Sequence, residues 1–149
     1  MATNSFTAII EVPKLPQDVY HSITSDVAKW WGGRDLEGSS IKLGDEFTIR
    51  HPGAHYSKQK LVELVPTSKV VWLVTDSTMD WLTKDKQEWT NTKMIFEITA
   101  KGDKTVLHFT HKGLVPEKEC YALCSQGWKT VIKDYLFHFI TNGKAHFLV

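Results

Sequence analysis

The chain has 149 residues, the usual size of one domain, and we expect a single domain over residues 1–149. Hydrophobic residues make up 42% and charged residues 23%, a globular composition that excludes a largely disordered chain. The formal net charge of +1 argues against a general nucleic-acid binder, which relies on many contacts from Lys and Arg to phosphates.

Membrane and secretion signals are not apparent in the sequence. The longest apolar run, residues 70–74, is far shorter than the roughly 20 residues of a membrane-spanning helix, so we expect no membrane insertion. The N-terminus lacks the basic and apolar regions of a signal peptide. Two cysteines, Cys120 and Cys124, are too few for a disulfide framework. A cytoplasmic location follows as the default expectation.

The first third of the chain predicts one strand and two short helical elements. Residues 6–12 are typical of a strand that ends before Pro13. Residues 16–23 begin with a proline in the first turn of a short helix. Residues 26–31 indicate a second helical turn, and Gly32-Gly33 ends it.

The middle of the chain predicts an antiparallel sheet. We expect its strands over residues 45–50, 56–65, 69–75, 89–99 and 105–111. Turn signals at His51-Pro52-Gly53 and Lys101-Gly102-Asp103 separate some of them, and short turns between successive strands imply a meander. Alternation assigns an inward face to the last two strands. This face comprises Thr90, Thr92, Met94, Phe96, Ile98, Leu107, Phe109 and His111.

The last third predicts a long amphipathic helix from Pro116 to about Asn142, with Gly143 as its stop. Its length would be roughly 40 Å. The apolar stripe comprises Tyr121, Cys124, Trp128, Val131, Ile132, Tyr135, Leu136 and Phe139. Such a stripe needs a concave sheet face, and a twisted sheet around a straight helix leaves a gap in which a ligand fits. The fold class is therefore α+β, with a curved sheet wrapped around the final helix.

Several local motifs carry a family resemblance over nearly the whole chain. They are Trp30-Trp31-Gly32-Gly33, the segment 88–92, the segment 108–116, Cys120-Tyr121 and Gly127-Trp128. With the order of elements, they resemble the helix-grip fold of the START/Bet v 1-like (SRPBCC) superfamily. Within it, the chain is similar to small bacterial stand-alone members of the Aha1-like branch (AHSA1, activator of Hsp90 ATPase homologue). The resemblance implies a cavity for a hydrophobic small molecule between sheet and helix.

Common catalytic and cofactor motifs are missing from the sequence. It contains no Gly-x-Ser-x-Gly elbow, P-loop or Gly-x-Gly-x-x-Gly, so we expect no cofactor. A metal site built from His108, His111, Cys120 and Cys124 is disfavoured, because the two histidines have opposite parity on their strand. We therefore expect no metal, and the cysteines are interpreted as small buried hydrophobic residues.

Six tryptophans are the one unusual feature of the composition. They line a cavity if several converge on one face, and otherwise fill an aromatic core. The candidate ligand-binding residues are Trp30, Trp31, Trp72, Thr90, Thr92, Met94, Phe96, Phe109, His111, Tyr121, Cys124 and Trp128. The threonine hydroxyls would orient a ligand. His111 is either a structural histidine, a polar group at one end of the cavity or a general base.

Three functions follow as hypotheses. The first is a non-catalytic binding protein for an apolar or aromatic small molecule, with no catalytic residue assigned. The second is a chaperone-associated interaction module, for which Ile95 and Val106 are the apolar seeds on the outer sheet face. The third is a small cyclase or hydratase that uses His111. The apolar tail, residues 145–149, would cap the sheet or contact a second copy of the chain.

Overall fold

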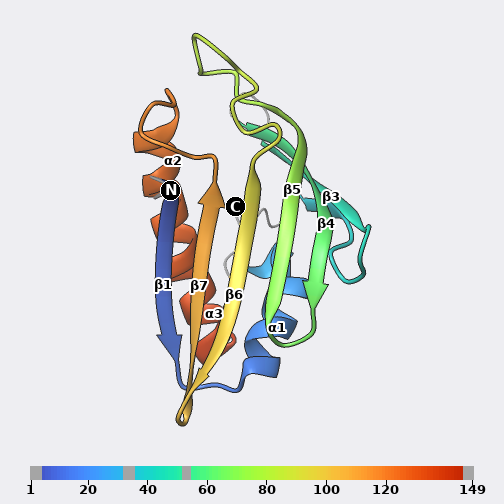
Figure 1. The fold of residues 1–149 in the computed structure, drawn as a ribbon, viewed down its shortest axis with the longest axis vertical. Coiled ribbons are helices and arrows are strands. Elements are labelled where there is room, and N and C mark those ends of the chain that lie inside the picture. Colours follow the sequence, from blue (N-terminus) through green and yellow to red (C-terminus); the bar gives the residue numbers. More distant parts are fainter. Residues whose placement is uncertain (1–4, 32–35, 52–54, 146–149) are drawn as a thin grey trace.

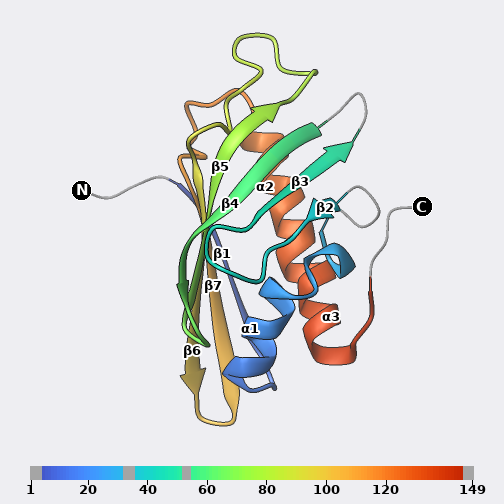
Figure 2. The same cartoon turned by 90° about the vertical axis from the view of Figure 1, so that its right-hand side faces the viewer.

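The protein is a seven-stranded antiparallel sheet that curves around a long C-terminal helix (Figures 1 and 2). The structure, a computed structural model, describes residues 5–31, 36–51 and 55–145. The strands are β1 (Phe6–Val12), β2 (Leu36–Gly38), β3 (Glu46–His51), β4 (His55–Val65), β5 (Lys69–Thr78), β6 (Lys93–Lys101) and β7 (Lys104–Lys112). Their order across the sheet is β1-β7-β6-β5-β4-β3-β2. The predicted fold class is confirmed.

Alternation along the strands builds the inner face of this sheet. β1 alternates strictly between buried and exposed residues, and β7 buries every second residue from Thr105 to His111. The β4–β5 ladder contains two register shifts, at Lys58/Gln59 and at Leu61/Glu63. Because such irregularities bend a strand and increase its twist, they help this half of the sheet to curl toward the helix.

Two short helical elements cross the inner side between β1 and β2. Helix α1 (Pro16–Thr24) has proline in its first turn, and the backbone N–H of Leu15 donates to Asp18 Oδ2 at 3.2 Å. The 3₁₀ turn η1 (Val27–Lys29) follows and delivers Trp30, whose indole N–H donates to the carbonyl oxygen of Ser22 at 2.8 Å. This bond fixes the ring against the sheet.

The C-terminal helix has three consecutive parts, α2 (Tyr121–Thr130), the π-helical segment η3 (Val131–Leu136) and α3 (Phe137–Asn142). Its most buried large side chains lie four apart, at Trp128, Ile132, Leu136 and Ile140. In an ideal α-helix such residues drift by about 40° per step, and the wider π turn reduces that drift. The helix ends as predicted, with Gly143 in the left-handed region at φ 69°.

Two predicted element starts are wrong, and one strand was missed. The final helix begins at Tyr121 rather than Pro116, because residues 116–120 form turns. Strand β6 begins at Lys93 rather than Trp89, because Asn91 adopts a φ of 72° and breaks the extended backbone before it. The short strand β2 was not predicted at all. Gly32-Gly33 and residues 146–149 of the tail lie outside the described residues.

The core lies between the sheet and the helices. Helix η3–α3 packs on β1, and α1 packs on β5, β6 and β7. Large side chains with no more than 2% of their surface exposed include Trp30, Trp72, Phe96 and Phe109. Within the described ranges, no helix is both long and apolar enough to cross a membrane.

Candidate functional site

A cavity of about 430 Å³ separates the C-terminal helix from strands β3 and β4. Its described wall consists of Trp30, Trp31, Ile49, His51, His55, Trp89, Cys124, Gly127, Trp128, Thr130, Val131 and Tyr135. Among these described residues there is no Asp, Glu, Lys or Arg, so this described part of the wall carries no permanent charge.

Indole rings form much of this wall and of the layer beneath it. Trp31 stacks on Trp72 with centroids 5.8 Å apart, and Trp89 stacks on Trp128 at 5.9 Å. Trp31 and Trp128 connect the two stacks at 5.0 Å. The Trp30 ring centroid lies 6.3 Å from that of Trp72. Five of the six tryptophans, Trp30 included, therefore belong to one cluster. Trp81 is separate and is 39% exposed.

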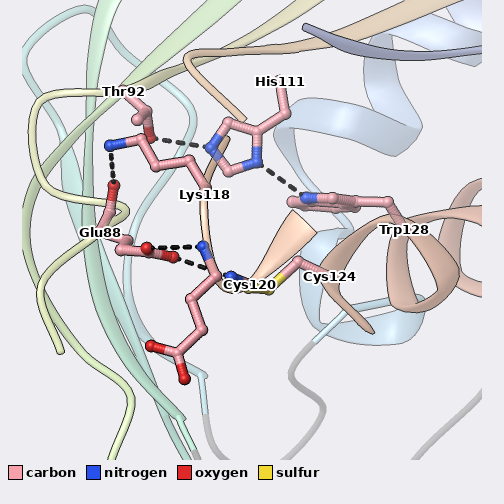
Figure 3. The surroundings of a disulfide bond; sticks show 8 residues. Glu88, Thr92, His111, Lys118, Cys120, Cys124 and Trp128 are labelled. Atoms are coloured by element: carbon pink, nitrogen blue, oxygen red, sulfur yellow. Dashed lines mark hydrogen bonds between the residues drawn. A yellow bond between two sulfur atoms is a disulfide. The ribbon is translucent and has the colours of Figure 1, made fainter. Parts of the chain in front are cut away.

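His111 holds the Trp128 ring in place from behind the wall (Figure 3). The Trp128 Nε1–H donates to His111 Nδ1 at 3.0 Å, so the proton of the neutral imidazole is on Nε2. That nitrogen donates to Thr92 Oγ1 at 2.8 Å, and the Thr92 hydroxyl donates to the carbonyl oxygen of Trp89 at 2.5 Å. Burial, with smaller effects from His55 and Lys118, lowers the pKa of His111 to about 3. The ring is therefore neutral and fully engaged.

Gly113 makes room for this hydrogen-bonded chain. Its φ of 106° is strained for any other residue, and a Cβ there would lie 2.7 Å from Thr92 Cγ2. The glycine thus allows the end of β7 to pass close to Thr92, which lets the threonine hydroxyl reach His111.

A second imidazole, that of His55, lies on the cavity wall itself. Its Nε2 lies 2.7 Å from Ser57 Oγ, and its ring contacts Trp89 edge-on at 4.9 Å. Burial and the neighbouring His51 lower the pKa of His55 to about 4. His55 is therefore neutral near pH 7, and it presents a polar but uncharged edge to the cavity.

Two carboxylates fasten the segment 79–92 to the start of the helix, and Figure 3 shows the first of them, Glu88. Glu88 accepts hydrogen bonds from the backbone N–H groups of Glu119 and Cys120, both at 2.9 Å. In return, Glu119 accepts bonds from the backbone of Thr83 and Lys84. Glu88 thereby satisfies N–H groups that the start of a helix leaves unpaired. The following residue, Trp89, is held as a wall of the cavity.

The two cysteines are joined to each other as a disulfide, which corrects the interpretation of them as separate hydrophobic residues. Their Cα atoms lie 5.5 Å apart, because residues four apart share one face of a helix. Cys120 is fully buried beneath the Glu88 carboxylate, whereas Cys124 borders the cavity. Among the described residues no three His, Cys, Asp or Glu side chains gather as metal ligands would.

The structure separates the twelve candidate residues into two groups. Four of them lie on the cavity wall, namely Trp30, Trp31, Cys124 and Trp128. The fully buried Trp72, Met94, Phe96, Phe109 and His111 lie in the packed core behind or beside it. Thr92 is buried against His111, and Thr90 is paired with Ser77 through their hydroxyls at 2.8 Å. Tyr121 packs half-buried at the start of the helix.

Sequence reasoning missed most of the wall. Val131 and Tyr135 were already on the predicted helix stripe, and their spacing from Trp128 was the signal. His51 shares its parity with Phe47 and Ile49 on β3, which alternation would have shown. Trp89 was hidden, because the positive φ of Asn91 changes the direction in which its side chain points. Gly127 lies on the wall as well, and a Cβ at this position would meet no atom within 4 Å and would face open space.

Residues 15–138 match the family described as activator of Hsp90 ATPase homolog 1-like protein. The chain belongs to this family. The match confirms the resemblance seen in the sequence, and it covers the α1 helix, the whole sheet from β2 to β7 and most of the C-terminal helix. No curated protein sequence matches the chain closely enough to add to it.

Solved structures show the same fold at low sequence identity. The Aha1 dimer from Colwellia psychrerythraea is 21% identical, with a TM-score of 0.76 over 96% of this chain and 100% of that one. An Hsp90 activator from Plasmodium falciparum is 15% identical, with a TM-score of 0.60 over 92% and 94% of the two chains. DynU16, from the dynemicin biosynthetic locus, is 15% identical, with a TM-score of 0.70 over 97% of this chain and 49% of that one.

Proposed function

We propose that the protein binds an uncharged, flat aromatic or apolar small molecule in the cavity between the C-terminal helix and strands β3 and β4. The observation that carries this proposal is the cavity itself, about 430 Å³ in volume and walled by four indole rings. Ligand sites in proteins commonly occupy about 300–1,000 Å³ and combine apolar walls with a few polar groups.

The lack of permanent charge on the described wall favours an uncharged ligand. Its described residues include no permanent charge, and the lowered pKa of His55 keeps that ring neutral near pH 7. A charged group would lose its hydration without gaining an opposite charge, which costs several kcal/mol. His55, Thr130 and Tyr135 offer hydrogen-bonding groups that suit a carbonyl or hydroxyl on the ligand.

A catalytic role for His111 is less well supported. A general base needs a free lone pair within reach of the substrate, whereas His111 Nδ1 already accepts the Trp128 proton and the side chain is fully buried. Its geometry fits a residue that positions Trp128.

A chaperone partner is the second candidate function, because the family description and the Plasmodium neighbour both name Hsp90 activation. The seeds expected for such a surface, Ile95 and Val106, are half-buried in the sheet. Stimulation of Hsp90 ATPase activity by the purified chain would favour this function, and no stimulation would leave the ligand-binding proposal in place.

The test uses Gly127, a wall position where a new side chain projects into open space from a helix. Gly127→Leu should fill the cavity while raising intrinsic helix stability by up to about 1 kcal/mol. Gln126→Leu, at the adjacent exposed position, adds the same side chain outside the wall and serves as the matched control.

Binding is measured by tryptophan fluorescence and native mass spectrometry with flavone, anthraquinone, 1-naphthol, palmitate and benzoate. We expect saturable quenching by the uncharged aromatic probes, at least about tenfold weaker in Gly127→Leu and unchanged in Gln126→Leu. Equal affinity in both variants, or no binding of any probe, would refute the proposal.

A further inference from the structure

The two edges of the sheet are protected to very different degrees. β2 is only three residues long, and very short strands are one of the ways in which proteins blunt an exposed edge. β1 is seven residues long and is the outermost strand on the other side (Figure 1). Its pairing with β7 runs without a register shift from Phe6 to Val12. It contains neither proline nor lysine, and among the described residues no bulge interrupts it and no further strand pairs with this edge.

The exposed side of β1 is apolar at its centre. Ile9 is the middle residue of the strand and is 56% exposed on the outer sheet face, across from His108 of β7. Glu11, the one charged residue of the strand, is already neutralised by Lys101 at 3.0 Å and Lys104 at 3.6 Å. An edge strand directs alternate N–H and C=O groups away from its neighbour, and here they flank an exposed isoleucine.

We propose that β1 pairs antiparallel with β1 of a second copy of this chain, about a two-fold axis that passes through Ile9 perpendicular to the sheet. The two sheets then continue as one. Ile9 lies opposite Ile9 of the second copy on the outer face, and Thr7 lies opposite the second copy's Glu11. No like charges face each other across this seam, and the formal net charge of +1 opposes association only weakly.

The second copy is the occupant that this edge fits best. A two-fold interface requires a self-complementary surface, and a strand centred on an apolar residue, with its carboxylate opposite a threonine, meets that requirement. The interface lies at the opposite end of the strand order from β3 and β4, so both cavities stay open. The inference is independent of the proposed ligand, and either can fail alone.

The test places a charge at the centre of the seam. Ile9→Lys and Ile9→Glu each put like charges opposite each other in a homodimer, whereas an equimolar mixture puts Lys opposite Glu. Leu43→Lys is the control, because Leu43 is 64% exposed and precedes β3 on the other half of the sheet. Circular dichroism and thermal melting verify that each variant is folded, which the exposure of Ile9 should permit.

Sedimentation velocity over a wide concentration range gives the outcome. We expect a wild-type dimer, at least about tenfold weaker dimerisation in each Ile9 variant, a heterodimer on mixing, and an unchanged Leu43→Lys dimer. A wild-type chain that stays monomeric overturns the proposal, as does a dimer that tolerates both charges. Loss in the single variants without recovery on mixing overturns the Ile9-centred register.

Discussion

The space between the sheet and the C-terminal helix is filled at one end and open at the other. Facing strands β5 to β7, it is occupied by Trp72, Phe96 and Phe109, none of which has any exposed surface. Facing β3 and β4, residues of the same kind border a cavity of about 430 Å³, including Trp31 and Trp128. Aromatic residues therefore become core or wall according to whether an opposing element reaches them, and their type and periodicity do not distinguish the two.

The largest expected effect comes from removing one ring in each half. Trp72→Ala should lower the free energy of unfolding by about 3–5 kcal/mol, the range for large aromatic residues deleted from a packed core. Trp31→Ala should cost less than half as much, because that ring already borders open space. Urea denaturation measures both losses, with the slope of unfolding free energy against urea concentration recorded for each variant. Equal losses would show that the open half is as well packed as the filled one.

The two histidines with lowered pKa values allow the filled and open halves to be compared through the pH dependence of stability. The pKa values of His111 and His55 in the folded protein are about 3 and about 4, below the ordinary value of 6.5. Between each folded pKa and about pH 6.5, the unfolded chain binds more protons than the folded protein. The free energy of unfolding is therefore highest above about pH 6.5 and falls as the pH decreases. At about pH 5 the loss should be roughly 2 kcal/mol for each histidine.

The control for this pH dependence is His55→Gln, which should remove about half of the slope of unfolding free energy against pH. An unfolding free energy that stays flat from about pH 7 to about pH 5 would contradict both lowered pKa values. A ligand in the cavity should change the titration of His55 and leave that of His111 unaltered, since of these two histidines only His55 lies on the wall.

Most of the fold was predictable because it follows from local patterns. β1 matches its predicted range, 6–12, because its alternation is strict and Pro13 ends it. The start of the helix was mispredicted at Pro116, because acidic residues before position 121 are typical of a helix N-terminus. Glu119 instead binds the backbone of Thr83 and Lys84, and the helix start is held by Glu88, 31 positions away from Glu119.

The candidate site was only partly predictable for a related reason. Alternation correctly placed Phe96, Phe109 and His111 on the inner face, but it does not indicate how far the helix lies from each strand. That distance depends on the curvature of the sheet, to which the register shifts of the β4–β5 ladder contribute. The hydrogen bond from Trp128 to His111 joins a helix to a strand, and no spacing along the chain encodes it.

An intermediate effect is expected where the open half is fastened. Glu88→Ala leaves the N–H groups of Glu119 and Cys120 without an acceptor, which should cost roughly 1–3 kcal/mol. Glu119→Ala should cost less, because the groups it releases are exposed and can bind water. Thermal denaturation compares the two variants.

Hydrogen exchange tests where the loosening caused by Glu88→Ala occurs. Faster exchange should appear in residues 79–92 and in the first turn of α2, while β1, β6 and β7 keep their protection. Uniform loosening of the whole sheet would show that the two halves unfold together, and it would remove the distinction between them.

The smallest effect is expected from the cysteine pair. The bond joins residues only four apart, and closing so short a loop restricts the unfolded chain little, so reduction should lower stability by at most about 2 kcal/mol. After reduction, Cys124 on the cavity wall should react with iodoacetamide well before the fully buried Cys120. Peptide mass spectrometry before and after dithiothreitol measures both rates.

A cavity-filling side chain at position 127 should slow the Cys124 reaction alone, because the reagent reaches that sulfur from the open half. Equal labelling of the two cysteines would mean that the first turn of α2 opens as a unit, and the boundary between filled and open halves would then lie beyond Cys120.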